Sequence, residues 1–253
     1  MSEETSIDVP EGWDIGGNTN GGYLMLRAAK FMREQAQRAM AVTVTGHFLR
    51  PVAAGPAQLT CDEIKRGRLL TTMRGDLIVD GRLALTLLGA FSDLDRQGQG
   101  SHFYAGSPPP LPPLEDCVPA WHLPTADALY RRIQIRCAAD DPTILGGKRG
   151  GTGALEAWIA PPEGAEVATC DDLLLLVDCF PPPVFDLDLP INWTPTVELT
   201  VHVRGVPAPG WLRARCSTRF VRDGLLEESV ELWDSADQLV AQSRQLAVEP
   251  RPR

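Results

Sequence analysis

The chain has 253 residues, a net charge of −9, 43% hydrophobic residues and 23% charged residues. This composition is typical of a globular protein with one large domain or two of about 125 residues. The acidic balance argues against a nucleic-acid partner, which requires a basic face, and means that an anionic ligand must meet a local basic group. The acidic N-terminus predicts no signal peptide, and no apolar stretch approaches the ~18 residues of a membrane span.

The first half of the chain predicts one helix followed by strands. After Asn20 an apolar periodicity predicts a helix that ends near Ala39. Four strand-like segments follow, at 42–50, 57–66, 69–79 and 82–91. Asp80-Gly81, between the last two segments, is a strong hairpin signal.

The second half repeats this order after a proline-rich crossing. Residues 92–114 are rich in Pro, Gly, Ser and Asp, which predicts an extended connection rather than a core element. Strand-like segments at 128–138 and 154–160 precede a leucine-rich helix over 171–180. Four more strand-like segments follow, at 196–204, 211–221, 225–233 and 239–248.

The two halves resemble each other, which indicates a duplication. Residues 44–50 can be laid on 198–204, and residues 81–84 on 237–240. One helix followed by four antiparallel strands, given twice, predicts an α+β layer design in which each sheet wraps its helix. We therefore expect a double hotdog, with an N-terminal hotdog over 1–92, a Pro-rich linker over 93–120, and a C-terminal hotdog over 121–253 that carries the catalytic residues.

Asp178 is the most informative residue of the chain. It follows the apolar run from Leu173 to Val177 and is separated by only two residues from three consecutive prolines. A carboxylate carried into a core must find donors there or shift towards its neutral form, which suits it to acid–base chemistry. The alternative is that Asp178 ends the run and faces water. The local pattern alone leaves these two interpretations equal.

Motifs in both halves support a family resemblance. In the first half they are Trp13, Asn20-Gly21-Gly22-Tyr23, Phe48-Leu49-Arg50-Pro51 and Arg66-Gly67-Arg68. In the second half they are Val177-Asp178-Cys179-Phe180, Thr196, Leu232-Trp233-Asp234 and 240–245, Val-Ala-Gln-Ser-Arg-Gln. With these motifs the chain resembles, over nearly its whole length, the acyl-CoA thioesterase II-like family of double-hotdog thioester hydrolases. It departs from the family pattern in its second helix, which is short and followed at once by prolines.

The resemblance implies an acyl-CoA substrate, no metal or other cofactor, and a catalytic trio of Asp178, Thr196 and Gln245. Pairing into a homodimer of double hotdogs is plausible from the family. In a thioester hydrolase Asp178 would accept a proton from the attacking water, while the Thr196 hydroxyl and the Gln245 amide would favour the ionised carboxylate and hold the water. Direct attack by Asp178, which forms an anhydride, stays open as a variant. At the aligned positions the first half has Val42 and Gly89, so we expect the chemistry in the second half.

Gly21 and Gly22 form a candidate oxyanion and substrate-binding site. Asn20 is a good helix N-cap, and the two glycines would begin the helix with unshielded N–H groups that a thioester carbonyl can approach closely. The alternative is that the glycines only permit tight packing of the helix on its sheet. The sequence leaves both interpretations open.

Other sites find less support in the sequence. There is no G-x-S-x-G motif for a serine nucleophile, and the glycine-rich segment 146–153 lacks the Ser or Thr that follows the lysine of a phosphate loop. The four histidines share no metal spacing. The six cysteines lie far apart without a C-x-x-C pair, and this scatter predicts reduced thiols in a cytoplasmic protein. A hotdog hydratase would need a histidine where Pro183 stands. The main alternative is a non-catalytic protein of the same fold that binds acyl-CoA or an acyl chain.

Overall fold

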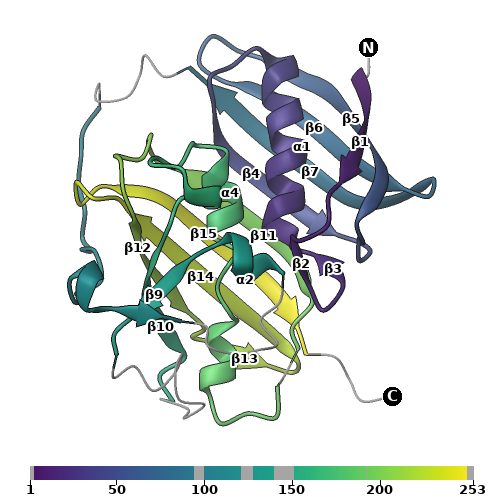
Figure 1. Cartoon of the computed structure of the whole chain (residues 1–253). Coiled ribbons are helices and arrows are strands. Elements are labelled where there is room, and N and C mark those ends of the chain that lie inside the picture. The colour runs from purple at the N-terminus through teal and green to yellow at the C-terminus, as the bar shows by residue number, and fades with distance from the viewer. Residues whose placement is uncertain (1–2, 94–99, 121–127, 140–150, 192, 250–253) are drawn as a thin grey trace.

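The structure is a computed structural model that describes residues 3–93, 100–120, 128–139, 151–191 and 193–249 (Figure 1). The first half contains strand β1 (Glu3–Val9), a short hairpin of β2 (Asp14–Ile15) and β3 (Asn18–Thr19), and helix α1 (Gly21–Ala36). Strands β4 (Met40–Phe48), β5 (Gly55–Arg66), β6 (Thr71–Val79) and β7 (Arg82–Ser92) follow. The helix and the four later strands confirm the elements that periodicity predicts for this half.

The second half contributes more and shorter elements. Turn η2 (Leu114–Asp116), strand β8 (Val118–Pro119), helix α2 (Leu129–Arg132) and strands β9 (Ile135–Cys137) and β10 (Ala154–Ile159) come first. Turn η3 (Pro162–Gly164), helix α4 (Asp172–Leu176) and turn η4 (Pro183–Asp186) lead to the last five strands. These are β11 (Thr196–Val203), β12 (Leu212–Ser217), β13 (Val221–Arg222), β14 (Leu225–Trp233) and β15 (Leu239–Val248).

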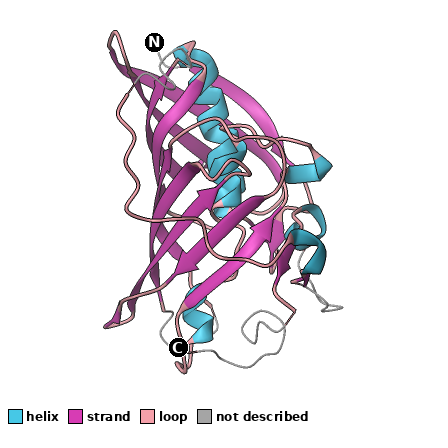
Figure 2. Cartoon of the chain, turned by 90° about the vertical axis from the view of Figure 1, so that its left-hand side faces the viewer, coloured by secondary structure: helices cyan, strands magenta, loops and turns pink. Residues whose placement is uncertain are grey.

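Both halves join in one antiparallel sheet. Among the described residues its order is β1-β5-β6-β7-β4-β11-β15-β14-β12-β10-β9-β8, with β13 beside β14. The sheet is curved, α1 lies against the inner face of its first half, and α4 packs on α1 (Figure 1 and Figure 2). This arrangement confirms the predicted α+β double hotdog.

The two halves are related by a pseudo-twofold axis between β4 and β11. Thr45 lies opposite Thr200, and their hydroxyl oxygens are 2.9 Å apart. On either side of this pair His47 lies opposite Glu198, and His202 lies opposite Thr43, so the two histidines occupy equivalent exposed positions. The same register irregularity follows in each half, between Ala41 and Thr43 in β4 and between Thr196 and Glu198 in β11.

Three local predictions need correction. The segment 128–138 is not a continuous strand, because its described part begins with helix α2 before β9. Helix α4 is shorter than the predicted 171–180, since the Asp178 N–H donates to the Leu175 carbonyl in a tight turn at 2.9 Å and prolines follow. Strand β1, which pairs with β5, was not predicted, because its sequence is mostly polar.

The hairpin prediction at Asp80-Gly81 is confirmed. Both residues have positive φ, 50° and 69°, as the two-residue turn between twisted strands requires. The glycine-rich segment 146–153, which lacks the phosphate-loop pattern, lies outside the described residues except for 151–153.

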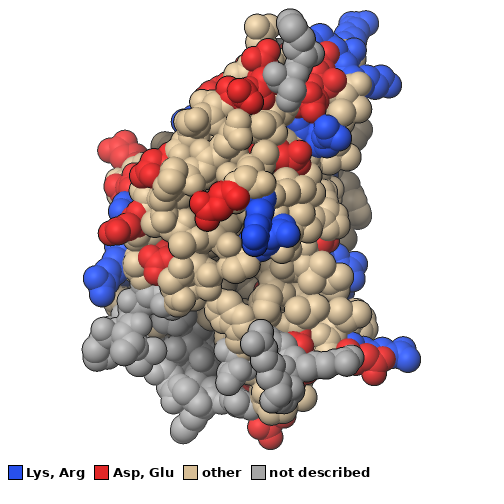
Figure 3. Space-filling view, turned by 90° about the vertical axis from the view of Figure 1, so that its right-hand side faces the viewer, with Lys and Arg blue, Asp and Glu red and all other residues tan. Residues whose placement is uncertain are grey.

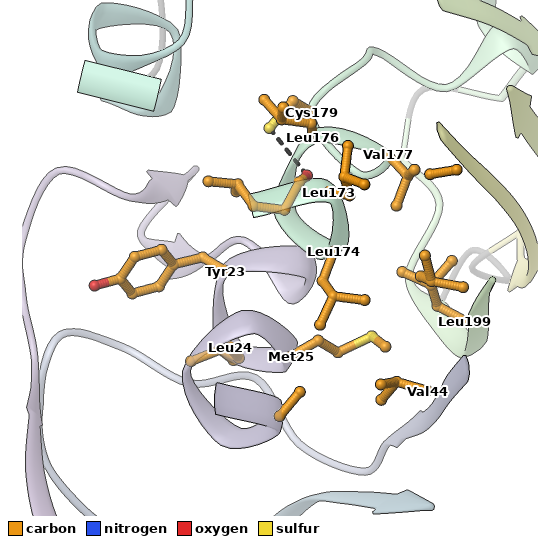
Figure 4. Close-up of a cluster of buried hydrophobic side chains, with 14 of the residues drawn as sticks. Tyr23, Leu24, Met25, Val44, Leu173, Leu174, Leu176, Val177, Cys179 and Leu199 are labelled. Carbon is orange, nitrogen blue, oxygen red and sulfur yellow. Dashed lines mark hydrogen bonds between the residues drawn. The ribbon is translucent and has the colours of Figure 1, made fainter. Parts of the chain in front are cut away.

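The core lies between the inner face of the sheet and the two helices. Methionines of α1 project onto glycines of the sheet: a Cβ added at Gly75 would lie 2.5 Å from the Met32 sulfur. Leu174 of α4 packs beside Met25 of α1, with Leu199 of β11 nearby (Figure 4). The leucine-rich run is therefore a central part of the core, as its apolar sequence predicts, and it carries Asp178 into the interior between the helices.

None of the six cysteines forms a disulfide, and no group of His, Cys, Asp and Glu in the described segments has a metal-binding arrangement. Among the described residues no helix is both long and apolar enough to cross a membrane. The face shown in Figure 3 carries small, separate groups of acidic and basic side chains on its described part, with no broad basic patch there.

Candidate active site

Asp178 lies at the N-terminus of helix α1, although it comes from the other half of the chain. Its Oδ2 accepts hydrogen bonds from the Gly22 N–H at 2.7 Å and from the Asn20 side chain at 3.0 Å. Asn20 also donates to the Asp178 carbonyl at 2.8 Å and caps α1 by accepting from the Tyr23 N–H. The positive end of the α1 dipole therefore faces a partly buried carboxylate.

The environment of Asp178 raises the pKa of its carboxyl to about 6. Burial is the largest cause, and the hydrogen bonds from Gly22 and Asn20 oppose it. Both donors bond Oδ2, whereas Oδ1 makes no hydrogen bond with the described part of the chain. An ionised carboxylate with one free oxygen and a pKa near neutrality is suited to accept a proton from water.

Gly21 and Gly22 pack tightly around this carboxylate. A Cβ at Gly22 would lie 2.7 Å from the Asp178 Cβ and 2.8 Å from the Leu174 carbonyl oxygen, whereas at Gly21 it would lie 2.8 Å from the Phe48 ring. Both glycines thus permit close packing, against α4 as well as against the sheet. The Gly22 N–H already donates to Asp178, while the Gly21 N–H makes no hydrogen bond among the described residues.

The structure places Thr196 and Gln245 on the inner face of the sheet. Gln245 is 7% exposed and lies opposite Leu199, which faces the core. Thr196 lies opposite Ala247, two residues further along β15, because the bulge at Val197 shifts the register. Directly opposed residues share a face of the sheet, so the bulge turns Thr196 to the same side as Gln245. By the same register Thr196 is equivalent to Ala41 of the first half, not to Val42.

One residue of this region was missed in the sequence. Glu228 of β14 lies opposite Gln245, and its Oε2 is 3.4 Å from the Gln245 Nε2. Burial, followed by the charges of Asp178 and Glu227, raises the pKa of Glu228 to about 8. The sequence did hold a signal for this residue: in the alternation of β14, Glu228 stands at a position between Leu226 and Val230 that should be apolar.

Glu228 connects the predicted residues in space. The charge of Asp178 acts on it directly, and Gln245 donates a hydrogen bond to it. Within the described residues no hydrogen bond joins Asp178, Thr196 and Gln245 to one another. The structure thus gathers carboxylates from two segments and an amide at the inner face, with Thr196 one residue pair away along the same face.

A cavity of about 380 Å³ is lined in part by residues of α1 and α4 that are close in sequence to this site. Its lining includes Leu175, three residues before Asp178, and Tyr23, which follows Gly22. The Tyr23 ring stacks on Trp13 with centroids 4.5 Å apart. Two guanidinium groups border these rings: Arg27 donates to the Tyr23 hydroxyl at 3.0 Å, and Arg132 lies 5.1 Å from the Trp13 centroid.

Arg66, which belongs to the Arg66-Gly67-Arg68 motif of the first half, lies far from Asp178. Its guanidinium pairs with Glu63 at 2.6 Å and donates to the carbonyl of Ala36, the last residue of α1. A 16-residue helix is roughly 24 Å long, so Arg66 lies at the opposite end of α1 from Asp178.

Solved structures share this fold over almost the whole chain. A candidate thioesterase II from Thermobifida fusca is 33% identical, with a TM-score of 0.87 over 98% of this chain and 92% of that one. A hot dog protein of unknown function from Alicyclobacillus acidocaldarius has a TM-score of 0.86 at 18% identity, covering 99% of this chain and 94% of its own. By its fold, the protein is a double hotdog of the thioesterase type.

Sequence matches identify the family within this class. Residues 9–92 match the acyl-CoA thioesterase N-terminal domain, and residues 109–248 match the acyl-CoA thioesterase C-terminal domain. The chain therefore belongs to the acyl-CoA thioesterase family. It is also 26% identical to an uncharacterized protein of Mycobacterium tuberculosis over 96% of this chain and 90% of that protein.

Proposed function

We propose that this protein hydrolyses an acyl-CoA thioester to the free acid and CoA. The observation that carries the proposal is the Asp178 carboxylate, which is held on one oxygen by Gly22 and Asn20 and has its other oxygen free. Residues of α1 and α4 close in sequence to this carboxylate, Tyr23 and Leu175 among them, line a cavity that could hold part of the substrate. The six cysteines, none of which forms a disulfide, support a reducing compartment such as the cytoplasm.

The proposed reaction uses water as the nucleophile. Oδ1 of Asp178 removes a proton from water while the oxygen attacks the thioester carbonyl, and the Thr196 hydroxyl and the Gln245 amide hold that water. The Gly21 N–H, which begins α1, donates to the developing oxyanion. Collapse of the tetrahedral intermediate breaks the C–S bond, and the proton taken up by Asp178 goes to the departing thiolate. The products are a carboxylic acid and CoA.

An assay of the purified protein with a ladder of acyl-CoA chain lengths tests the proposal. We expect release of free CoA thiol for at least one chain length, measured with a thiol reagent. The competing function is binding without hydrolysis, which would give saturable acyl-CoA binding and no thiol at any chain length. That second result would overturn the proposal.

Arg27 is expected to contact the phosphates of CoA. CoA carries several phosphate charges, and Arg27 lines the cavity together with the aromatic rings of Tyr23 and Trp13. We expect Arg27→Ala to raise KM for acyl-CoA about tenfold, because a charge-assisted hydrogen bond is lost. KM for the same acyl group on N-acetylcysteamine, which lacks phosphates, should change less than about threefold.

A matched control for this prediction is Arg222→Ala, since the Arg222 side chain is 90% exposed on β13. It should leave both KM values unchanged. If Arg27→Ala raised KM equally for acyl-CoA and for the N-acetylcysteamine substrate, Arg27 would support the cavity wall rather than bind the phosphates.

A further inference from the structure

Glu228 is a second carboxyl group of this site for which the reaction above has no role. It lies on the inner face of β14, in one row with Gln245 of β15 and Leu199 of β11. Its Oε2 accepts a hydrogen bond from the Gln245 amide at 3.4 Å. Its Oε1 is buried and has no hydrogen-bond partner in the described part of the chain. An unpaired buried carboxyl oxygen is costly to a fold and calls for a functional reason.

The duplication shows that the fold itself does not require this carboxyl. In the first half Met73 lies opposite Gly89, just as Glu228 lies opposite Gln245 in the second. Counting outward from the pseudo-twofold axis, these two pairs occupy equivalent positions, and so do Ala41 and Thr196. Three small or apolar residues on the inner face of the first half thus correspond to three polar residues on the inner face of the second: Ala41 to Thr196, Gly89 to Gln245, and Met73 to Glu228.

Burial and two neighbouring acidic groups favour the neutral form of Glu228. Asp178, from the segment after α4, and Glu227, on the same strand, are both acidic and raise its pKa after burial, the largest cause. Cys216 of β12 is a buried thiol whose own pKa is raised, first by burial and then by Glu228. Gln245, from β15, is uncharged. The burial of Oε1 and the neighbouring negative charges therefore both favour a protonated Glu228 at neutral pH.

We propose that Glu228 is a positioning residue of the hydrolytic site: as a neutral acid it fixes the Gln245 amide through Oε2 and keeps a second negative charge away from Asp178. This inference rests on the proposed function. With one Gln245 N–H held by Glu228, the remaining N–H and the amide oxygen of Gln245 are directed to water. Loss of the Glu228 proton would add a second anion close to Asp178 while negative charge develops on the substrate, and hydrolysis would slow.

Three variants test this role through the pH profile of kcat. Glu228→Ala should lower kcat about tenfold at pH 7 with little change in KM, because Gln245 loses its anchor. Glu228→Gln keeps a neutral group of the same shape and should restore kcat to within about threefold of the wild type. It should also abolish the decline in kcat that the wild type shows above about pH 8. Glu231→Gln, on the outer side of the same strand beside Arg215, is the control and should keep that decline.

Thermal stability gives a readout that does not depend on catalysis. A carboxyl with a folded pKa of about 8, above its ordinary value of 4.5, stabilises the fold fully below pH 4.5 and loses this contribution as pH rises to about 8. The Tm of Glu228→Gln should therefore exceed that of the wild type at about pH 8.5, and the difference should shrink towards about pH 5. The Glu231→Gln variant should show no such pH-dependent difference.

The outcomes separate the two proposals. If the wild type releases no thiol from any acyl-CoA, the hydrolase function fails, and the role of Glu228 fails with it. If the wild type is active but Glu228→Ala matches it, or if Glu228→Gln keeps the alkaline decline, only the Glu228 proposal is overturned. An equal Tm for Glu228→Gln and wild type at every pH would also contradict a neutral Glu228.

Discussion

Asp178→Asn is expected to lower kcat for acyl-CoA hydrolysis about 10³-fold, the usual range for removal of a general base. The fold should persist, because both donors bond Oδ2 and an amide oxygen can replace it as the acceptor for Gly22 and Asn20. The amide nitrogen would then stand at the position of Oδ1, where it cannot take a proton from water. The measurement is thiol release under saturating substrate, with circular dichroism to confirm folding.

The pH profile of the wild type provides a control for the same residue. A base must be ionised, so kcat should fall about tenfold per pH unit below pH 6, where the Asp178 carboxyl becomes protonated. The residual rate of Asp178→Asn should not follow this limb. If Asp178→Asn kept more than about a tenth of wild-type kcat, Asp178 would not be the base. Single turnover in heavy-oxygen water tests the covalent variant, since label in the protein would indicate an anhydride.

Gly22→Ala is expected to destabilise the protein by about 3 kcal/mol and to remove most activity. Alanine normally stabilises a helix by roughly 1 kcal/mol relative to glycine, so the sign of the effect depends on the surroundings. Here the new Cβ would lie 2.8 Å from the Leu174 carbonyl oxygen and 3.0 Å from that of Leu175, and backbone atoms cannot move aside cheaply. Helix α4 would have to shift away from α1, taking Asp178 with it. Urea unfolding and thiol release measure the two effects.

Two other glycines serve as comparisons. At Gly21 the added Cβ meets the end of the Phe48 ring, a side chain that can rotate, so Gly21→Ala should cost clearly less stability than Gly22→Ala. At Gly100 the added Cβ meets nothing within 4 Å, and Gly100→Ala should be neutral. Equal stability of all three variants would show that α1 and α4 do not pack as closely as the structure indicates.

Much of the fold follows from local sequence patterns. The alternation in β14 and β15 and the turn at Asp80-Gly81 predict strands and a hairpin that agree with the structure within a residue or two. Helix α4 does not agree with its predicted range, because its end is set by a turn at Asp178 and by the prolines that follow. Apolar content alone cannot predict where such a helix ends. Residues 118–119, inside the range predicted as a linker, form strand β8 by pairing with β9, a long-range contact that no local pattern encodes.

The sequence by itself determined the duplication, the family resemblance and the residue types available for chemistry, because these depend on order and periodicity along the chain. Only the tertiary structure decided what each group does. It brought Asp178 of the second half to the Gly22 N–H of the first, and a one-residue bulge turned Thr196 to the inner face. Cross-strand register placed Glu228 against Gln245. Burial and neighbouring charge, which set the ionisation of both carboxyls, exist only when segments distant in the chain are packed together.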